Sequence, residues 1–142
     1  MILHLLQELC IITPMIRLLV LPIFLLTLLI GTPASAADWM KGVDAFDKGD
    51  YKNALREWKP LAEQGNAKAQ YMLGVMYDKE KGVTRNYKTA VKWYRLAAEE
   101  GYARAQYNLG QMYFFGIGAI RDYSLAHMWW NIAASQGDNV AT

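Results

Sequence analysis

Apolar residues recur at every third or fourth position along most of the chain after residue 37, the spacing that places them on one side of a helix. Asp38 stands where it can cap a first helix. Gly49 and Asp50 then combine a helix-ending glycine with a helix-capping aspartate. The pattern predicts helices over residues 38–48, 51–64, 67–78, 87–99, 103–115 and 122–135.

Two consecutive stretches, residues 65–100 and 101–136, repeat each other without a gap at an offset of 36 residues. The shared positions are mainly glycine, alanine and aromatic residues, among them Gly65/Gly101, Ala69/Ala105, Gln70/Gln106, Tyr71/Tyr107, Leu73/Leu109, Gly74/Gly110, Tyr77/Tyr113, Gly82/Gly118, Tyr87/Tyr123, Ala90/Ala126 and Trp93/Trp129. A fixed period of this length is typical of a helical repeat array. The same offset relates residues 51–65 to both later copies, so they are a third copy of the second half-repeat, with residues 38–48 as a diverged first half.

Two departures from ordinary helix and turn chemistry lie at equivalent places in the repeats. Gly74 and Gly110 fall in the middle of predicted helices, where glycine costs about 1 kcal/mol relative to alanine. We expect helices to approach closely there, with Trp93 or Trp129 over the bare backbone. In the loop, Glu80 stands in the place of Gly116. If that position needs a positive φ, the first copy is strained or closes its turn differently.

The first 36 residues have the pattern of a secretory signal peptide. Arg17 precedes an uncharged apolar run over residues 18–30, and Ala34-Ser35-Ala36 supplies a cleavage site. Met15 is a better start for such a peptide than Met1. We therefore expect a periplasmic or secreted protein beginning at residue 37. The alternative is an inner-membrane anchor over residues 15–30, although this run is short for a membrane span.

The remainder of the chain offers little for catalysis or metal binding. The single cysteine, Cys10, lies in the leader, and His127 is the only histidine after it. His127 is equivalent to Leu55 and Val91, which predicts a partly buried structural residue. No zinc-ligand cluster or catalytic triad is present in the sequence. We expect no enzymatic activity and no cofactor.

Charge does not point to nucleic acid. Lys and Arg number 15 against 13 Asp and Glu, a net charge of +2, and the signs are mixed along the chain. A nucleic-acid footprint needs a basic patch or stripe. A membrane partner is expected only if the leader is not cleaved.

The string A-x-A-Q-Y-x-L-G-x-M-Y, followed by Y-x-x-A-x-x-W-Y/W-x-x-A-A-x-x-G, resembles the Sel-one-like repeat, a relative of the tetratricopeptide repeat. The resemblance covers residues 49–137 and is of the exported bacterial type. It implies an all-α fold, a short α/α solenoid of about two and a half helix-hairpin repeats. The expected parts are a signal peptide (1–36), a diverged N-terminal repeat (37–65), two repeats (66–100 and 101–137) and the start of a further repeat (138–142).

The resemblance also implies a non-enzymatic scaffold that binds a protein or peptide on a concave face lined by the first helix of each repeat. The residues expected on that face vary between copies while the framework repeats: Lys68, Met72, Val75, Lys79, Arg104, Asn108, Gln111 and Phe115. The alternative is a self-associating module that pairs through the outer face of its last helix, using Met128, Trp129, Trp130 and Ile132.

Overall fold

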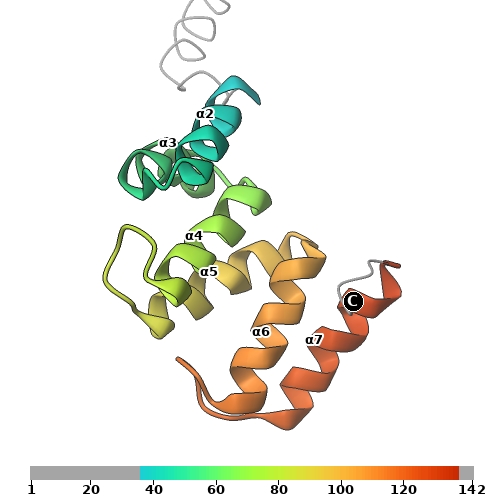
Figure 1. Cartoon of the computed structure of the whole chain (residues 1–142). Helices are drawn as coiled ribbons and strands as arrows, with labels where there is room; N and C mark the ends of the chain where they lie inside the picture. The colour runs from blue at the N-terminus through green and yellow to red at the C-terminus, as the bar shows by residue number, and fades with distance from the viewer. Residues whose placement is uncertain (1–35, 138–142) are drawn as a thin grey trace, which may run out of the picture. The chain divides into compact units, whose positions relative to one another are not determined.

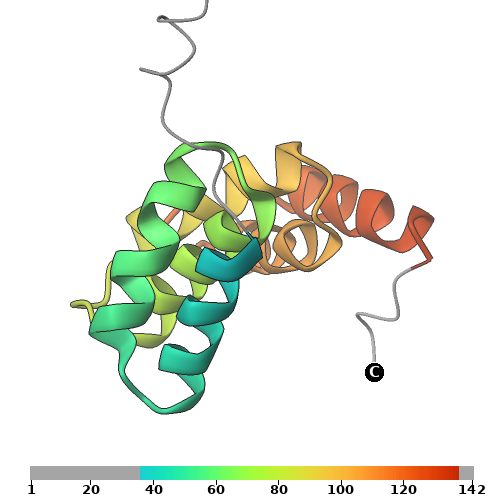
Figure 2. The ribbon, with the colours of Figure 1, turned by 90° about the horizontal axis from the view of Figure 1, so that it is seen from above.

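The computed structural model describes residues 36–137, with side chains from residue 38. The predicted signal peptide before Ala36 and the predicted further repeat at 138–142 lie outside the described residues. The described part confirms the all-α prediction: six helices pack as consecutive hairpins, with α2 and α3 at one end and α7 at the other (Figures 1 and 2). Their bounds are α2 Ala36–Asp47, α3 Tyr51–Glu63, α4 Ala67–Lys79, α5 Tyr87–Glu99, α6 Ala103–Phe115 and α7 Tyr123–Ser135.

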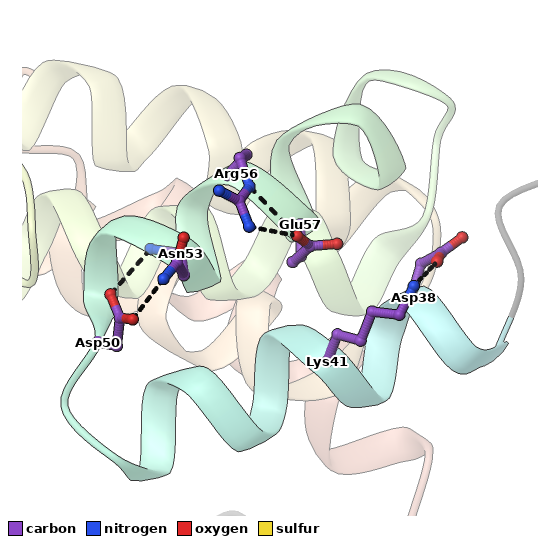
Figure 3. Close-up of polar contacts among 6 residues, drawn as sticks. All are labelled: Asp38, Lys41, Asp50, Asn53, Arg56 and Glu57. Carbon is purple, nitrogen blue, oxygen red and sulfur yellow. Dashed lines mark hydrogen bonds and ion pairs between the residues drawn. The ribbon is translucent and has the colours of Figure 1, made fainter.

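The helix ends follow local sequence chemistry. Asp50 caps α3 as predicted, since its carboxylate accepts a hydrogen bond from the backbone N–H of Asn53 at 3.2 Å (Figure 3). Hydrogen bonds from the side chain and backbone of Asn53 also hold the pKa of Asp50 below its usual range. The prediction that Asp38 caps the first helix is wrong. Because α2 begins at Ala36, Asp38 lies in its first turn and pairs with Lys41 at 3.1 Å.

Each helix packs mainly against its neighbours in sequence, as expected of a repeat array. The buried side chains form two clusters. One joins α3 to α4, and the other joins α5 to α6 with one alanine from α7. The cores therefore lie largely between the second helix of one hairpin and the first helix of the next.

Within each hairpin, an aromatic ring from the second helix lies on a glycine of the first. A Cβ at Gly74 would clash with the ring of Tyr94, and one at Gly110 would clash with the indole of Trp130. This confirms the close approach but corrects its partner, which is the residue after Trp93 or Trp129. The reason is geometric: one step along a helix turns the side chain by 100°.

The hairpin of α2 and α3 has the same construction. Trp58 lies against Gly42, and its indole N–H donates to the carbonyl of Trp39 at 3.3 Å. Trp130 donates to the carbonyl of Tyr107 in the same way at 3.1 Å. Gly42 precedes Gly74 by 32 residues, whereas Gly74 precedes Gly110 by 36. The first hairpin has the shorter offset because its two helices are joined by residues 48–50, against residues 80–86 and 116–122 in the later hairpins.

Glu80 adopts the conformation of the glycine that it replaces. Its φ is 58°, close to the 69° of Gly116, and both residues end their helix in the left-handed region. The loops then close identically, with Asn86 N–H on the Tyr77 carbonyl and Asp122 N–H on the Tyr113 carbonyl, each at 3.0 Å. Of the two alternatives, the structure shows strain, on the order of 1 kcal/mol for a residue with a Cβ.

Buried glutamines connect one hairpin to the next. Gln70 donates to the carbonyl of Ala62, and Gln106 donates to that of Ala98, each at 3.1 Å. The other amide atom differs: Gln106 Oε1 accepts from Gln136 Nε2 at 3.0 Å, whereas Gln70 Oε1 is buried without a hydrogen-bond partner in the described part of the chain. Glu100 occupies the place of Gln136 and has no proton to donate when ionised.

We predict that Glu100→Gln stabilises the fold, because the new amide can donate to Gln70 Oε1 as Gln136 donates to Gln106. A hydrogen bond that satisfies a buried acceptor adds about 1 kcal/mol to the free energy of unfolding. Urea denaturation followed by circular dichroism measures this change. Glu99→Gln makes the same charge change on the neighbouring exposed residue, and an equal gain in both variants would contradict the proposed hydrogen bond.

Candidate functional site

The eight residues predicted to bind a partner lie on α4 and α6, the first helices of the second and third hairpins. Lys68, Lys79 and Arg104 are exposed, and 62% of Phe115 is accessible to solvent. Lys79 pairs with Asp78 at 3.0 Å, whereas Lys68 and Arg104 make no ion pair among residues 38–137. The charged, solvent-facing part of this surface therefore has two cations available to an acidic partner.

The other four residues are half-buried and partly committed to the fold. Met72 packs against the α3–α4 cluster, and Val75 packs against the cluster of α5 and α6. Gln111 donates to the hydroxyl of Tyr107 at 3.3 Å. The fourth residue, Asn108, lies beside two tyrosine hydroxyls. The surface open to a partner is accordingly narrower than the sequence pattern suggests, and its role in binding stays a prediction.

Asn108 is held beside Tyr71 and Tyr94. Burial is the main cause that raises the pKa of each tyrosine above its usual value, and hydrogen bonding to Asn108 acts in the opposite direction. The nearby Asp78 carboxylate raises the pKa of Tyr94 further. Both hydroxyls therefore stay protonated near neutral pH. The hydroxyl of Tyr94 donates a hydrogen bond to Asp78 Oδ2 at 3.4 Å, so these side chains form a hydrogen-bonded group between α4, α5 and α6.

The outer face of α7 differs from the predicted pairing surface. Met128 and Ile132 are exposed, at 42% and 36%, whereas Trp129 and Trp130 are half-buried and turn towards the core. The expectation that His127 is partly buried is wrong, because its side chain is exposed. The equivalent Val91 is buried by the packing of α6 on α5. No further helix covers α7 within residues 36–137.

Among the described residues, no three His, Cys, Asp or Glu side chains group together as a metal site. None of the helices α2–α7 is long and apolar enough to cross a membrane.

Comparison with known proteins agrees with the repeat architecture. The model of the Sel1 repeat matches residues 67–102 and 103–138, about half of the chain. The chain belongs to the Sel1 repeat family. The two matched stretches begin at α4 and α6, so each Sel1 repeat starts with one of the helices that carry the predicted binding residues.

Solved structures of Sel1-repeat proteins share both sequence and fold with this chain. A Sel1 repeat protein from Oxalobacter formigenes is 35% identical with a TM-score of 0.67, over 70% of this chain and 41% of that chain. The protein c5321 is described as a protective antigen present in uropathogenic Escherichia coli strains that displays an SLR fold. It is 36% identical with a TM-score of 0.68, over 73% of this chain and 23% of the antigen. This chain thus spans less than half the length of either one. No curated protein sequence matches it.

This Sel1-repeat protein also has a groove on the second helices of its repeats, which was not predicted from the sequence. It measures about 640 Å³ and lies among α5, the loop from α6 to α7, and the start of α7. Its lining includes three cations of α5, Lys88, Lys92 and Arg95, and none of the eight predicted residues. A signal was present: Lys52, Arg56 and Lys59 occupy the same positions one repeat earlier.

Proposed function

We propose that the protein is an exported, non-enzymatic adaptor that binds a protein or peptide through the concave face lined by α4 and α6. Membership of the Sel1 repeat family supports a scaffold role. The single observation that carries the choice of surface is the contrast within these helices. Framework residues such as Gln70 and Gln106 repeat and are buried, while Lys68 and Arg104 are exposed cations that make no ion pair with any other described residue.

Phe115 and the two cations define the partner's chemistry. Arg104 lies in the first turn of α6 and Phe115, which is 62% exposed, ends the same helix about 16 Å away along its axis. An extended or helical segment that carries acidic residues towards one end and an apolar residue towards the other suits this spacing. Desolvated aromatic and cationic contacts of this kind contribute most to the affinity of protein interfaces.

We predict that a photo-cross-linking phenylalanine analogue at position 115 captures a partner in the expressing cell, and that Lys68→Glu with Arg104→Glu lowers the yield by about tenfold, because buried charge contacts dominate dissociation. The readout is the cross-linked band on a denaturing gel. The same analogue at Met40, which is 59% exposed on α2, is the background control.

Lys52→Glu with Lys59→Glu makes the same change of net charge on α3 and should leave the yield unchanged. Partner capture that persists at full yield after charge reversal at Lys68 and Arg104 would rule out this face.

Export is the second part of the proposal and rests on the apolar run over residues 18–30 followed by Ala34-Ser35-Ala36. We predict that the mature protein begins at Ala37, so the intact mass of the protein from a cell that expresses the full chain equals that of residues 37–142. The protein should occur in the periplasm or medium. A mass that retains residues 15–36, found in the membrane fraction, would instead support a tethered scaffold.

A second candidate function is self-association through α7. The observation that favours it is the exposure of His127 and Ala134, since the equivalent Val91 and Ala98 are buried under the next hairpin. Met128 and Ile132 add apolar area to that face.

If two copies pair through α7, light scattering should give a dimer mass at high protein concentration, and Met128→Glu with Ile132→Glu should restore the monomer because burying charge without a partner is unfavourable. Lys92→Glu with Leu96→Glu, at equivalent positions on α5, is the matched control. A strict monomer at all concentrations would exclude this function.

A further inference from the structure

The groove beside α5 has the composition of a docking site, and it is separate from the face assigned above. Val91, Leu96 and Leu125 supply apolar lining, and Ile120 adds a side chain that is 91% exposed. An isoleucine so fully exposed beside other apolar groups is typical of an interaction surface. The volume, about 640 Å³, lies within the usual range for sites that enclose a few side chains.

The charges of the groove cations are not neutralised by carboxylates within the described part of the chain. Lys88, Lys92 and Arg95 form no ion pair among the residues that the structure describes. Arg95 instead donates to the hydroxyl of Tyr113 at 2.6 Å, which fixes its position in the groove. Lys88 and Lys92 are one helical turn apart, where like charges repel and destabilise a helix slightly.

Among the described residues of the lining, Asp122 is the one acidic residue, so it cannot neutralise three cations. The carboxylate of Asp122 accepts a hydrogen bond from the backbone N–H of Leu125 at 3.0 Å and caps α7. Three exposed cations therefore face a groove with an apolar wall and one carboxylate, which leaves an excess of positive charge. Charge complementarity points to an anionic occupant.

The basic positions repeat along the chain and then stop. Lys52, Arg56 and Lys59 on α3 correspond to Lys88, Lys92 and Arg95 on α5, whereas the corresponding residues of α7 are Ser124, Met128 and Asn131. Arg56 is also paired with Glu57 at 3.2 Å, and Lys59 lies 4.0 Å from Glu63 (Figure 3 shows the former pair). Lys52 makes no ion pair in the described part of the chain, but α5 is the copy in which all three cations lack one there.

The positions one repeat earlier also lack two of the apolar side chains that line the groove. Thr84 stands in the place of Ile120, and Pro60 in the place of Leu96. Apolar wall and unpaired cations therefore coincide only at α5 among these repeated positions. We propose that this groove binds an acidic, amphipathic peptide segment of a partner protein, with its carboxylates on Lys88, Lys92 and Arg95 and an apolar side chain against Leu96 and Ile120.

A peptide fits the groove better than the other anionic macromolecules. Single-stranded nucleic acid is bound through exposed aromatic rings that stack on bases, whereas Tyr113, the aromatic residue of the lining, is only 7% exposed. An anionic membrane is flat and would meet the whole stripe of cations on α3 and α5, without a need for the apolar groove.

The test uses the protein purified from cells that express the full chain and a short fluorescein-labelled peptide in which glutamate alternates with leucine. Fluorescence anisotropy should show saturable binding that weakens as salt is added, since exposed charges are screened. Lys88→Glu with Lys92→Glu should weaken binding by about tenfold or more, and Ile120→Ser by roughly threefold. Circular dichroism should show an unchanged fold, because all three side chains are exposed.

The matched control is Lys52→Glu with Lys59→Glu, which changes the net charge equally but lies outside the groove and should keep affinity within about twofold. A second peptide, with serine in place of leucine, should bind about tenfold more weakly. Equal loss in both double variants, or equal binding of the two peptides, would overturn the proposal in favour of non-specific charge attraction. Absence of peptide binding, with binding to phosphatidylglycerol vesicles that requires Lys88 and Lys92, would overturn it in favour of a membrane.

Discussion

The contact of an aromatic ring with a bare glycine backbone sets the geometry of every hairpin in the described chain. Gly42, Gly74 and Gly110 each lack the Cβ that would collide with the ring of the partner helix. Glycine costs about 1 kcal/mol in a helix, and the ring that it admits, Trp58 or Tyr94, is fully buried. The close approach then fixes the side chains of both helices in register. In that register, the buried Gln70 and Gln106 donate hydrogen bonds to the last turn of the preceding hairpin.

Because the hairpins stack in one direction, the last helix of the described array, α7, has an uncovered outer side. The core clusters lie between the second helix of one hairpin and the first helix of the next, so α3 and α5 are covered on their outer side by α4 and α6. The same positions on α7 hold His127 and Ala134, which are exposed. Exposure of these positions on α7 thus follows from the repeat design, because no further hairpin within residues 36–137 covers them.

Repeat periodicity made the helices predictable, because two copies at the same offset confirm each other's boundaries. It predicted α5 and α6 to the residue and the other helices to within one or two residues. It was misleading where the residues that match between copies are not the ones that make the equivalent contact. Trp93 and Trp129 are identical and therefore conspicuous, but Tyr94 and Trp130 perform the equivalent packing. The short connection at residues 48–50 likewise hid Gly42, since it changes the offset of the first hairpin.

The predicted binding surface was harder to obtain from the sequence, because variation between copies does not distinguish a recognition residue from one that packs sideways. Met72 and Val75 differ from their equivalents Asn108 and Gln111, yet both pack against the two core clusters, so the difference does not mark them as recognition residues.

The opposite signal, cations kept at three equivalent positions of α3 and α5 and lost in α7, is the more informative one. The framework does not require a positive charge there, as Ser124, Met128 and Asn131 demonstrate in the same fold. On α5 the cations border an apolar groove and make no ion pair with the rest of the described chain, so ion pairing does not account for their presence. One short array thereby presents two chemically different faces, one on the first helices of its repeats and one on the second.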